Sequence, residues 1–411
     1  MGDPVAAMRS LRFLLAATAL VTAATAQDGL PGTARLIDGR SLTGALAVAD
    51  GRATLVTTEG PVAFDLAEMT AFEAAQAIAV PIAADHRVWL RSGLELPVTR
   101  LTGVAGAPGK PAMVTIATPG GLVFDVPLTT VRAIRQGGKE RPEPPLFAAD
   151  LRQPPSSDDL IFVVKDGKAQ RSVVTVKALT AERIDFLLRG DAFEFELAGL
   201  AGVVFGATTG FPPDRQPRPR TRVALTSGEL LEGRLLTLAA TGLQCRLDEG
   251  AVVDVPAARV LSLQVASDRL AWLTEMQPRV EQTPAFDRVW PWTVDRSPVG
   301  QGLVLGGKTF ARGLCLVPRT RLTYDLGGRF DVFEATIGID DRGGPEAHAI
   351  LRVLVDDKVV FDSGPRTRGQ APETIRLELQ KAKTLALEAD FGKNYDLGDY
   401  CVFADPRVVQ K

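Results

Sequence analysis

The sequence contains only two histidines among its 411 residues, and they stand far apart, at His86 and His348. Neither has a metal-ligating or catalytic spacing, and the HExxH, GxSxG and Walker patterns are all missing. A glycine-rich stretch at residues 300–306 precedes no helical pattern, so we expect a turn there rather than a phosphate-binding loop. These absences argue against the common metalloprotease, serine hydrolase and nucleotide-binding classes, and we predict that the protein is not an enzyme.

An excess of charge of one sign is also lacking. The 47 Lys and Arg residues nearly offset the 49 Asp and Glu residues, which leaves a formal net charge of −2. Nucleic-acid binding requires a clustered basic face, so no nucleic-acid partner is expected. Helical patterns are scarce, and 45% of the residues are hydrophobic. A chain of this length and composition is expected to fold as several small units.

No apolar run reaches the roughly 20 residues that a membrane-spanning helix needs. The run Phe13–Val21 follows two arginines and precedes the small residues Ala24–Ala26. This order is typical of a secretory signal peptide, which we predict at residues 1–26, with Met8 as an alternative start. We therefore expect a secreted, periplasmic or cell-envelope protein with no membrane span in the mature chain. A retained membrane anchor is the alternative.

The region from residue 31 to residue 268 repeats a pattern of short alternating strands and glycine turns. The clearest similarity joins Asp38–Gly44 (DGRSLTG) and Ser227–Gly233 (SGELLEG). Each copy has the content of a small five-stranded barrel and cannot bury its apolar face alone, so it must curl up on itself or pack on its neighbour. We predict four β repeats, at residues 31–75, 86–136, 158–206 and 221–268.

The remaining segments are connections and a separate C-terminal module. Residues 137–157 and 207–220 are rich in proline and charge, and we predict both as linkers. A short helix is expected at Arg269–Met276. The last third, residues 286–410, again alternates apolar and polar residues, with turn signals every 8–12 residues, which favours an antiparallel sandwich. The predicted fold class is all-β, with tandem small β-barrel-like repeats followed by a β-sandwich.

Five ordered motifs in this last third carry a resemblance to a known family. They are Gly307–Leu314 (GKTFARGL), Leu322–Leu326 (LTYDL), Phe333–Asp341 (FEATIGIDD), Val355–Gly364 (VDDKVVFDSG) and Ala404–Val408 (ADPRV). In this order they resemble the NPCBM family of carbohydrate-binding modules, which is also found attached to glycosyl hydrolases of family 98. The resemblance implies a galactose-binding-like jelly roll at residues 286–410 with a glycan-facing surface.

The sequence departs from the family pattern at two places. Val317 stands where family members commonly carry a histidine, and Asp399–Phe403 (DYCVF) replaces a usual D-H-A-D-W strand. The apolar positions are kept, so the expected fold is unchanged. If the missing polar groups help to hold a ligand, binding is weakened or lost in this protein.

Aromatic residues make up only 6% of the sequence, so the candidates for sugar contact are few. In the last third they are Trp290, Trp292, Tyr395, Tyr400 and Phe403. The two tryptophans occupy alternate positions of an extended V-W-P-W stretch, which would place both rings on one face. We predict Trp292, Trp290, Asp399 and Tyr400 as ligand-binding residues. Alternatively, the tryptophans seal the edge of the sandwich.

Aspartates are frequent in the same module, and Asp340 and Asp341 directly follow a predicted strand. Because oxygen-rich loops of sandwich modules often hold a structural calcium ion, we predict these two residues as candidate metal ligands. No other cofactor is expected. The alternatives are turn capping by the aspartate side chains and a glycosidase pair, which requires two carboxylates facing each other across a sugar.

The resemblance also bears on the three cysteines. It places Cys315 and Cys401 in the first and last core strands of the module, which often run side by side, and so implies a disulfide between them. Cys245 would remain a buried free thiol. The alternative is that Cys315 and Cys401 are buried free thiols as well.

These features predict a secreted, non-catalytic protein that binds a glycan or scaffolds other components at the cell surface. The alternatives are a structural envelope protein whose module has lost ligand binding, and an accessory or cryptic glycoside hydrolase. A glycan is the partner that the sequence suggests, and nothing in it identifies a protein partner.

Overall fold

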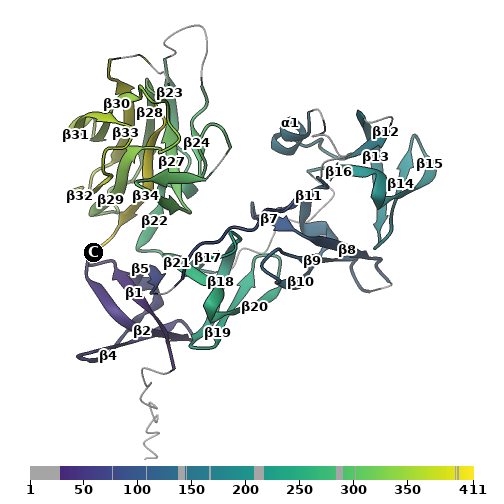
Figure 1. Cartoon of the computed structure of the whole chain (residues 1–411), viewed down its shortest axis with the longest axis horizontal. Coiled ribbons are helices and arrows are strands. Elements are labelled where there is room, and N and C mark those ends of the chain that lie inside the picture. The colour runs from purple at the N-terminus through teal and green to yellow at the C-terminus, as the bar shows by residue number, and fades with distance from the viewer. Residues whose placement is uncertain are drawn as a thin grey trace, which may run out of the picture.

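The structure is a computed structural model (Figure 1). It describes residues 28–75, 77–107, 109–137, 144, 146–165, 168–207, 217–283, 290–300, 302–393, 395 and 398–411. The predicted signal peptide therefore lies outside the described residues. Among the described elements, none of the helices has the length and hydropathy required of a membrane-spanning helix. β-Strands make up most of the described chain, as the all-β prediction requires.

The first and fourth repeats form one body, here called the outer pair, although the other two repeats lie between them in sequence. Its first half contains β1 (Leu30–Leu36), β2 (Ser41–Ala49), β3 (Arg52–Thr57), β4 (Gly60–Asp65), the 3-10 helix η1 (Leu66–Glu68) and β5 (Met69–Ala74). Its second half contains β17 (Arg220–Leu225), β18 (Leu230–Ala239), β19 (Gly242–Leu247), β20 (Val252–Pro256), η4 (Ala257–Arg259) and β21 (Val260–Ala266). Within the described residues these strands form a ten-stranded sheet in the order β20-β19-β18-β17-β21-β5-β1-β2-β3-β4.

The second and third repeats form the inner pair in a similar way. The second repeat contains β6 (His86–Leu90), β7 (Glu95–Val98), β8 (Arg100–Val104), β9 (Met113–Ala117), β10 (Val123–Pro127), η2 (Leu128–Thr130) and β11 (Val131–Arg135). After α1 (Phe147–Arg152), the third contains β12 (Asp159–Lys165), β13 (Lys168–Leu179), β14 (Arg183–Leu188), β15 (Asp191–Glu196), η3 (Leu197–Gly199) and β16 (Leu200–Val204). The sheet order, as far as the chain is described, is β15-β14-β13-β12-β16-β11-β6-β7, with β10-β9-β8 as a separate sheet.

Both pairs are joined through the last strand of each repeat. Phe72 of β5 lies opposite Leu263 of β21, and Ile134 of β11 lies opposite Val203 of β16. A five-stranded unit leaves the backbone N–H and C=O groups of its edge strands unpaired, and antiparallel pairing of two such edges satisfies them. Each pair is therefore a dimer-like unit built within one chain.

The C-terminal third is a sandwich of two antiparallel sheets. One sheet contains β24 (Thr293–Val294), β27 (Gly313–Leu316), β34 (Cys401–Val409), β29 (Val332–Ile339) and β32 (Glu373–Glu378), and β22 (Leu270–Trp272) also pairs with β34. The other contains β23 (Arg279–Gln282), β28 (Thr320–Asp325), β33 (Thr384–Phe391), β30 (His348–Val355) and β31 (Lys358–Thr367). A hairpin of β25 (Leu303–Leu305) and β26 (Lys308–Phe310) packs beside them.

The segment before the sandwich differs from the prediction. Arg269–Met276 does not form the expected helix, because Leu270–Trp272 pairs with the end of β34 and only the 3-10 turn η5 (Leu273–Glu275) follows. The predicted start of the module at residue 286 leaves out β22 and β23, which belong to its two sheets. Strands of only three or four residues, such as β22 and β23, are too short to show a period in sequence.

The predicted Cys315–Cys401 disulfide is wrong. The two strands are adjacent, as expected, but Cys315 lies opposite Val402 and Cys401 lies opposite Leu316. Because successive side chains of a strand point to opposite faces, this offset of one residue directs the two thiols to opposite sides of the sheet. Cys401 packs in the sandwich core and Cys315 packs under the β25–β26 hairpin. All three cysteines, which lie in the described part of the chain, are free and buried.

Thiol titration of the denatured, unreduced protein is therefore expected to give three free thiols. The native protein should react slowly, because burial raises the pKa of the Cys245 thiol to about 12 and keeps it protonated. A mass increase corresponding to three labels after denaturation would agree with the structure. A single label would instead indicate that two of the cysteines form a disulfide, which would contradict the structure.

Two carboxylates of the fourth repeat lie at the contact between the inner pair and the outer pair. Glu229 accepts a hydrogen bond from the Gly120 amide at 2.6 Å and another from the Ser227 hydroxyl. Glu249 is buried against Ser92, on another turn of the second repeat. Burial raises the pKa of the Glu249 carboxyl above its ordinary value of 4.5, and among the described residues neither of its buried oxygens has a hydrogen-bond partner. For Glu229, burial also acts to raise the pKa, but its hydrogen bonds lower the pKa overall.

The substitutions Glu249→Gln and Glu229→Gln are expected to have opposite effects on stability at pH 7. A raised folded-state pKa means that ionised Glu249 opposes folding, so the wild type gains stability from this group as the pH falls through the raised pKa towards 4.5. Glu249→Gln should therefore raise the melting temperature at pH 7, whereas Glu229→Gln should lower it. Thermal unfolding of both variants between pH 4.5 and pH 7 tests this, and destabilisation by both would contradict it.

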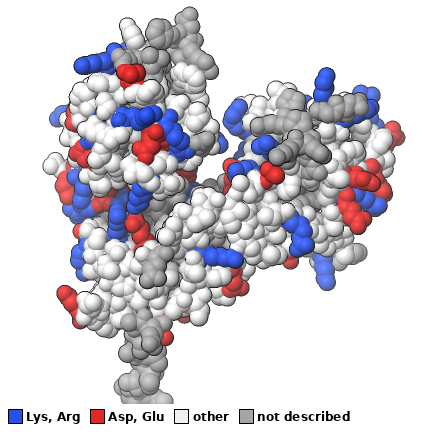
Figure 2. All heavy atoms as spheres, in the orientation of Figure 1, with Lys and Arg blue, Asp and Glu red and all other residues white. Residues whose placement is uncertain are grey.

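The sandwich lies over the outer pair and contacts both of its repeats (Figure 1). Arg222 of β17 donates to Asp295 at 2.7 Å, Gln264 of β21 donates to Asp405 at 2.6 Å, and Lys308 of β26 donates to Glu73 of β5 at 2.9 Å. On the face shown in Figure 2, charges of both signs are interspersed over all of these units. This distribution matches the low net charge of the sequence.

Candidate functional site

One end of the sandwich points away from the outer pair, and we call it the distal end. The Val409 end of β34 pairs with β22 beside the repeats, so the Cys401 end of this strand lies at the distal end. Antiparallel pairing brings the start of β28 to the end of β33, with Thr320 opposite Ala389. The described loops around these strand ends contain all the predicted site residues.

Trp290 is the first exposed aromatic residue of the distal end. Its side chain is 39% exposed. The Gln282 side-chain amide donates to the Trp290 carbonyl oxygen at 3.1 Å and to the Thr320 hydroxyl at 2.9 Å. These two bonds attach the Trp290 backbone to β23 and β28, and the indole keeps an exposed surface.

Tyr395 is the second exposed aromatic residue of the distal end, and its side chain is 57% exposed. Its ring meets the Phe391 ring edge-on, with the centroids 5.8 Å apart. The Arg319 guanidinium carbon lies 5.5 Å from the centroid of the same Phe391 ring. An exposed phenol and a guanidinium are thus both placed against Phe391, at the point where β28 and β33 meet. The Gln282 side chain bonds both to the Trp290 carbonyl oxygen and to Thr320 at the start of β28. The Trp290 backbone is therefore attached close to the junction of β28 and β33.

The other aromatic candidates are used for packing. Trp292 is half-buried and packs against the core of the sandwich, whereas Trp290 is exposed, and a role of Trp292 in ligand binding stays a prediction. Tyr400 is half-buried against the cluster under the β25–β26 hairpin, and Phe403 is completely buried. The alternation argument fails at the two tryptophans because neither lies in a strand in the described structure.

Asp399 is 1% exposed, and its Oδ1 accepts a hydrogen bond from the His348 amide at 2.7 Å. The His348 ring in turn accepts one through Nδ1 from the Lys393 amide at 3.0 Å. Asp399 and His348 therefore hold the loop after β33 against the start of β30. Asp399 supports the distal end from beneath and presents little surface to a ligand.

Asp340 and Asp341 do not form the arrangement expected of a calcium site. Buried Asp340 accepts from the Val304 amide at 3.0 Å and pairs with Arg342, and Asp341 accepts from the amides of Gly306 and Gly307 at 3.0 and 2.7 Å. These bonds attach the β25–β26 hairpin to the end of β29. No group of three or more metal-ligating side chains occurs among the described residues. The observed arrangement fits turn capping.

The sequence did not predict Arg319 or Phe391. Both follow ordinary turn or strand patterns, and they meet only through the pairing of β28 with β33. Arg319 has a backbone φ of +66°, in the left-handed region, but no preceding glycine or asparagine marks this turn. Tyr395, in contrast, was among the aromatic candidates.

Comparison with known proteins confirms the family resemblance for the C-terminal third. Residues 269–409 match the NPCBM/NEW2 domain. A protein of Renibacterium salmoninarum named "Putative endo-alpha-N-acetylgalactosaminidase" is 34% identical over 138 residues, which cover 30% of this chain and 9% of that protein. The chain thus spans only a small part of the length of this curated relative.

Solved structures to which the chain shows a partial likeness include two sets of carbohydrate-binding modules. One is the CBM51 module of a Clostridium perfringens GH95 protein in complex with methyl-galactose, with 22% identity, 34% of this chain and 99% of that chain covered, and a TM-score of 0.31. The other is the tandem CBM51 modules of the family 98 glycoside hydrolase from Streptococcus pneumoniae SP3-BS71. It has 12% identity, 61% and 88% coverage, and a TM-score of 0.31.

Proposed function

We propose that the NPCBM/NEW2 domain, residues 269–409, binds a glycan at its distal end, and that the protein is secreted and non-catalytic. The observation that carries the proposal is that two exposed rings, Trp290 and Tyr395, lie at the same end of the sandwich as the Arg319 guanidinium. Membership of the domain in a carbohydrate-binding family supports a sugar as the ligand. The outer pair leaves this end of the sandwich uncovered (Figure 1).

The chemistry of these side chains suits a sugar ring. The C–H groups on one face of a pyranose pack against an aromatic ring, which buries apolar surface on both partners. Hydroxyl oxygens on the edge of the sugar can accept hydrogen bonds from the five N–H donors of Arg319. The three groups come from different elements, so one sugar or two successive sugars could contact more than one of them.

The arrangement of the carboxylates supports a role without catalysis. A glycosidase requires two carboxyl groups across the scissile bond, one of them with a raised pKa. At the distal end, Asp340, Asp341 and Asp399 each accept hydrogen bonds from backbone amides. In each case the carboxylate is engaged in holding a loop or hairpin in place.

Glycan binding by the mature full-length chain should fall when either exposed ring is removed. Trp290→Ala and Tyr395→Ala are each expected to weaken binding about tenfold, since one stacked aromatic ring contributes on the order of 1.5 kcal/mol. Glycans that contain N-acetylgalactosamine are the first probes, because the named activity of the curated relative concerns this sugar. A glycan array followed by calorimetry with the best ligand provides the measurement.

Phe193→Ala is the matched control, because Phe193 is 45% exposed but lies on β15 of the inner pair. It should leave glycan affinity unchanged. Silence of the wild type across the array would favour a structural envelope protein and contradict the proposal. Release of free sugar from any bound glycan would contradict the absence of catalysis.

A further inference from the structure

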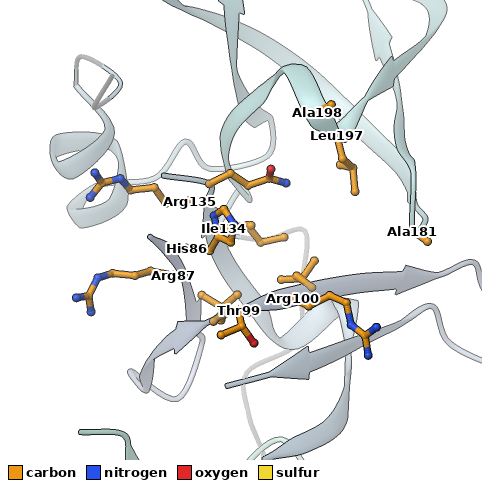
Figure 3. Close-up of a pocket in the computed structure, with 13 residues that line it drawn as sticks. His86, Arg87, Thr99, Arg100, Ile134, Arg135, Ala181, Leu197 and Ala198 are labelled. Carbon is orange, nitrogen blue, oxygen red and sulfur yellow. The ribbon is translucent and has the colours of Figure 1, made fainter. Parts of the chain in front are cut away.

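The inner pair contains a pocket that the proposed function does not use. It has a volume of about 230 Å³ and lies between the second and third repeats, far from the distal end of the sandwich. Its walls come from the ends of β6 and β11, from the junction of β7 and β8, and from the turns around Ala181 and Ala198 (Figure 3).

The pocket exists because the second repeat departs from the pattern of the other three. In those repeats the second strand is continuous, as in β2, β13 and β18. In the second repeat it is interrupted at Thr99, whose amide and hydroxyl both donate to the Ala117 carbonyl oxygen, at 2.8 and 3.1 Å. The interruption moves β8 into a separate sheet with β9 and β10. This displacement of β8 leaves the pocket open between the second and third repeats.

The outer pair closes the corresponding space. There β2 and β18 pair directly, with Thr237 opposite Ala49. The position of β1 that corresponds to His86 is Gly32, which faces Ala74 of β5. A Cβ atom at Gly32 would lie 2.3 Å from the Glu73 carbonyl oxygen and 2.4 Å from the Phe72 ring, so no side chain fits. The inner pair has His86 and Gln136 at these two positions, and both line the pocket.

The lining of the pocket combines an apolar wall with cationic and neutral polar groups. Leu197 and Ile134 are buried, Leu101 is half-buried, and no Asp or Glu contributes to the described lining. Within the described chain, the exposed Arg100 guanidinium has neither an ion-pair nor a hydrogen-bond partner. Figure 3 shows Arg100 on the side of Ala181, whereas Arg87 and Arg135 extend together to the other side and away from it.

We propose that this pocket binds a compact organic carboxylate with a short aliphatic body. The carboxylate would pair with Arg100 beside the polar groups of His86 and Gln136. The aliphatic part would rest on Ile134, Leu101 and Leu197. The volume is below the roughly 300–1,000 Å³ of pockets for drug-sized ligands, which limits the ligand to a few carbon atoms. A carboxylate can pair bidentately with the planar donor array of a guanidinium, and unlike inorganic phosphate it can carry an aliphatic body that packs on the apolar wall.

Calorimetric titration of the mature full-length chain with isobutyrate tests the proposal. We expect saturable binding with a dissociation constant on the order of millimolar, and none with the neutral isostere isobutyramide. Arg100→Met should weaken binding at least about tenfold through loss of a charge-assisted hydrogen bond. Ala181→Leu, which fills the mouth of the pocket from an exposed position, should abolish it.

Arg87→Met is the matched control and should bind isobutyrate as the wild type does, because Arg87 points away and its Nη1 pairs with Glu95 at 2.8 Å. Equal binding of isobutyramide would overturn the proposal, and so would an unchanged affinity in Arg100→Met. Tighter binding of glucuronate than of isobutyrate would contradict the proposal that the ligand has an aliphatic body. Melting temperatures equal to that of the wild type would show that the variants are folded. Glycan binding at the distal end is a separate measurement and can fail independently.

Discussion

Replacing Arg312 by alanine is expected to lower the free energy of unfolding by about 3–5 kcal/mol, the usual cost of removing one partner of a buried ion pair. Arg312 is 1% exposed. Its Nη1 donates to Glu275 at 2.5 Å, and its guanidinium lies 5.0 Å from the centroid of the Trp272 ring. Desolvation of the buried guanidinium lowers the pKa of Arg312, but the side chain stays charged at neutral pH.

Arg312 interacts electrostatically with a charge network that crosses from the sandwich to the fourth repeat and contains Arg222, Glu232 and Asp295. Glu232 of β18 accepts from Arg222 of β17, and Arg222 also donates to Asp295 and to the Ala311 carbonyl oxygen. Alanine at position 312 would leave a cavity beside Trp272. It would also remove a positive charge that offsets the carboxylates of Glu275 and Glu232. The loss should therefore appear both as lower stability and as weaker coupling between the sandwich and the outer pair.

Urea unfolding followed by tryptophan fluorescence measures the effect, with the midpoint as the observable because a chain of several units need not unfold in two states. Arg279→Ala is the matched control. Arg279 also pairs with a glutamate, Glu281, but its side chain is 70% exposed, so its loss should change stability by less than about 0.5 kcal/mol. Similar midpoint shifts for the two variants would refute the buried network.

Phe72→Ala is expected to destabilise the first and fourth repeats together. Phe72 is completely buried on β5 and faces Leu263 of β21 across the junction of the outer pair. Truncation of a buried phenylalanine costs about 3–5 kcal/mol through lost burial and the cavity that remains. Because β5 is hydrogen-bonded to both β1 and β21, the cavity loosens two repeats that are remote in sequence.

Hydrogen exchange measured by mass spectrometry can detect this coupling. Amides of β1 and of β17 and β21 should lose protection in the variant, while those of β12–β14 in the inner pair should keep theirs. Loss of protection confined to residues 30–74 would show that the first and fourth repeats unfold independently, which would contradict the coupling expected from their shared sheet. Phe193→Ala, an exposed truncation on the inner pair, should leave protection in the outer pair unchanged.

The sequence by itself determined the class of the fold and the family of the C-terminal third. Alternation of apolar and polar residues is a local property, and it is visible in strands such as β1 and β19, where buried and exposed side chains alternate. The five ordered motifs similarly identify the NPCBM/NEW2 domain, because they keep the apolar positions of its core strands.

Only the tertiary structure decided which repeats pair and which side chains reach the surface. The end strands of the repeats resemble one another, so local patterns do not specify that β5 joins β21 rather than a strand of the second repeat. The register between β27 and β34 is also set by distant contacts, and one residue of offset separates Cys315 from Cys401. Trp290 is exposed and Trp292 packs on the core for the same reason, because the direction of a side chain outside a strand depends on contacts remote in sequence.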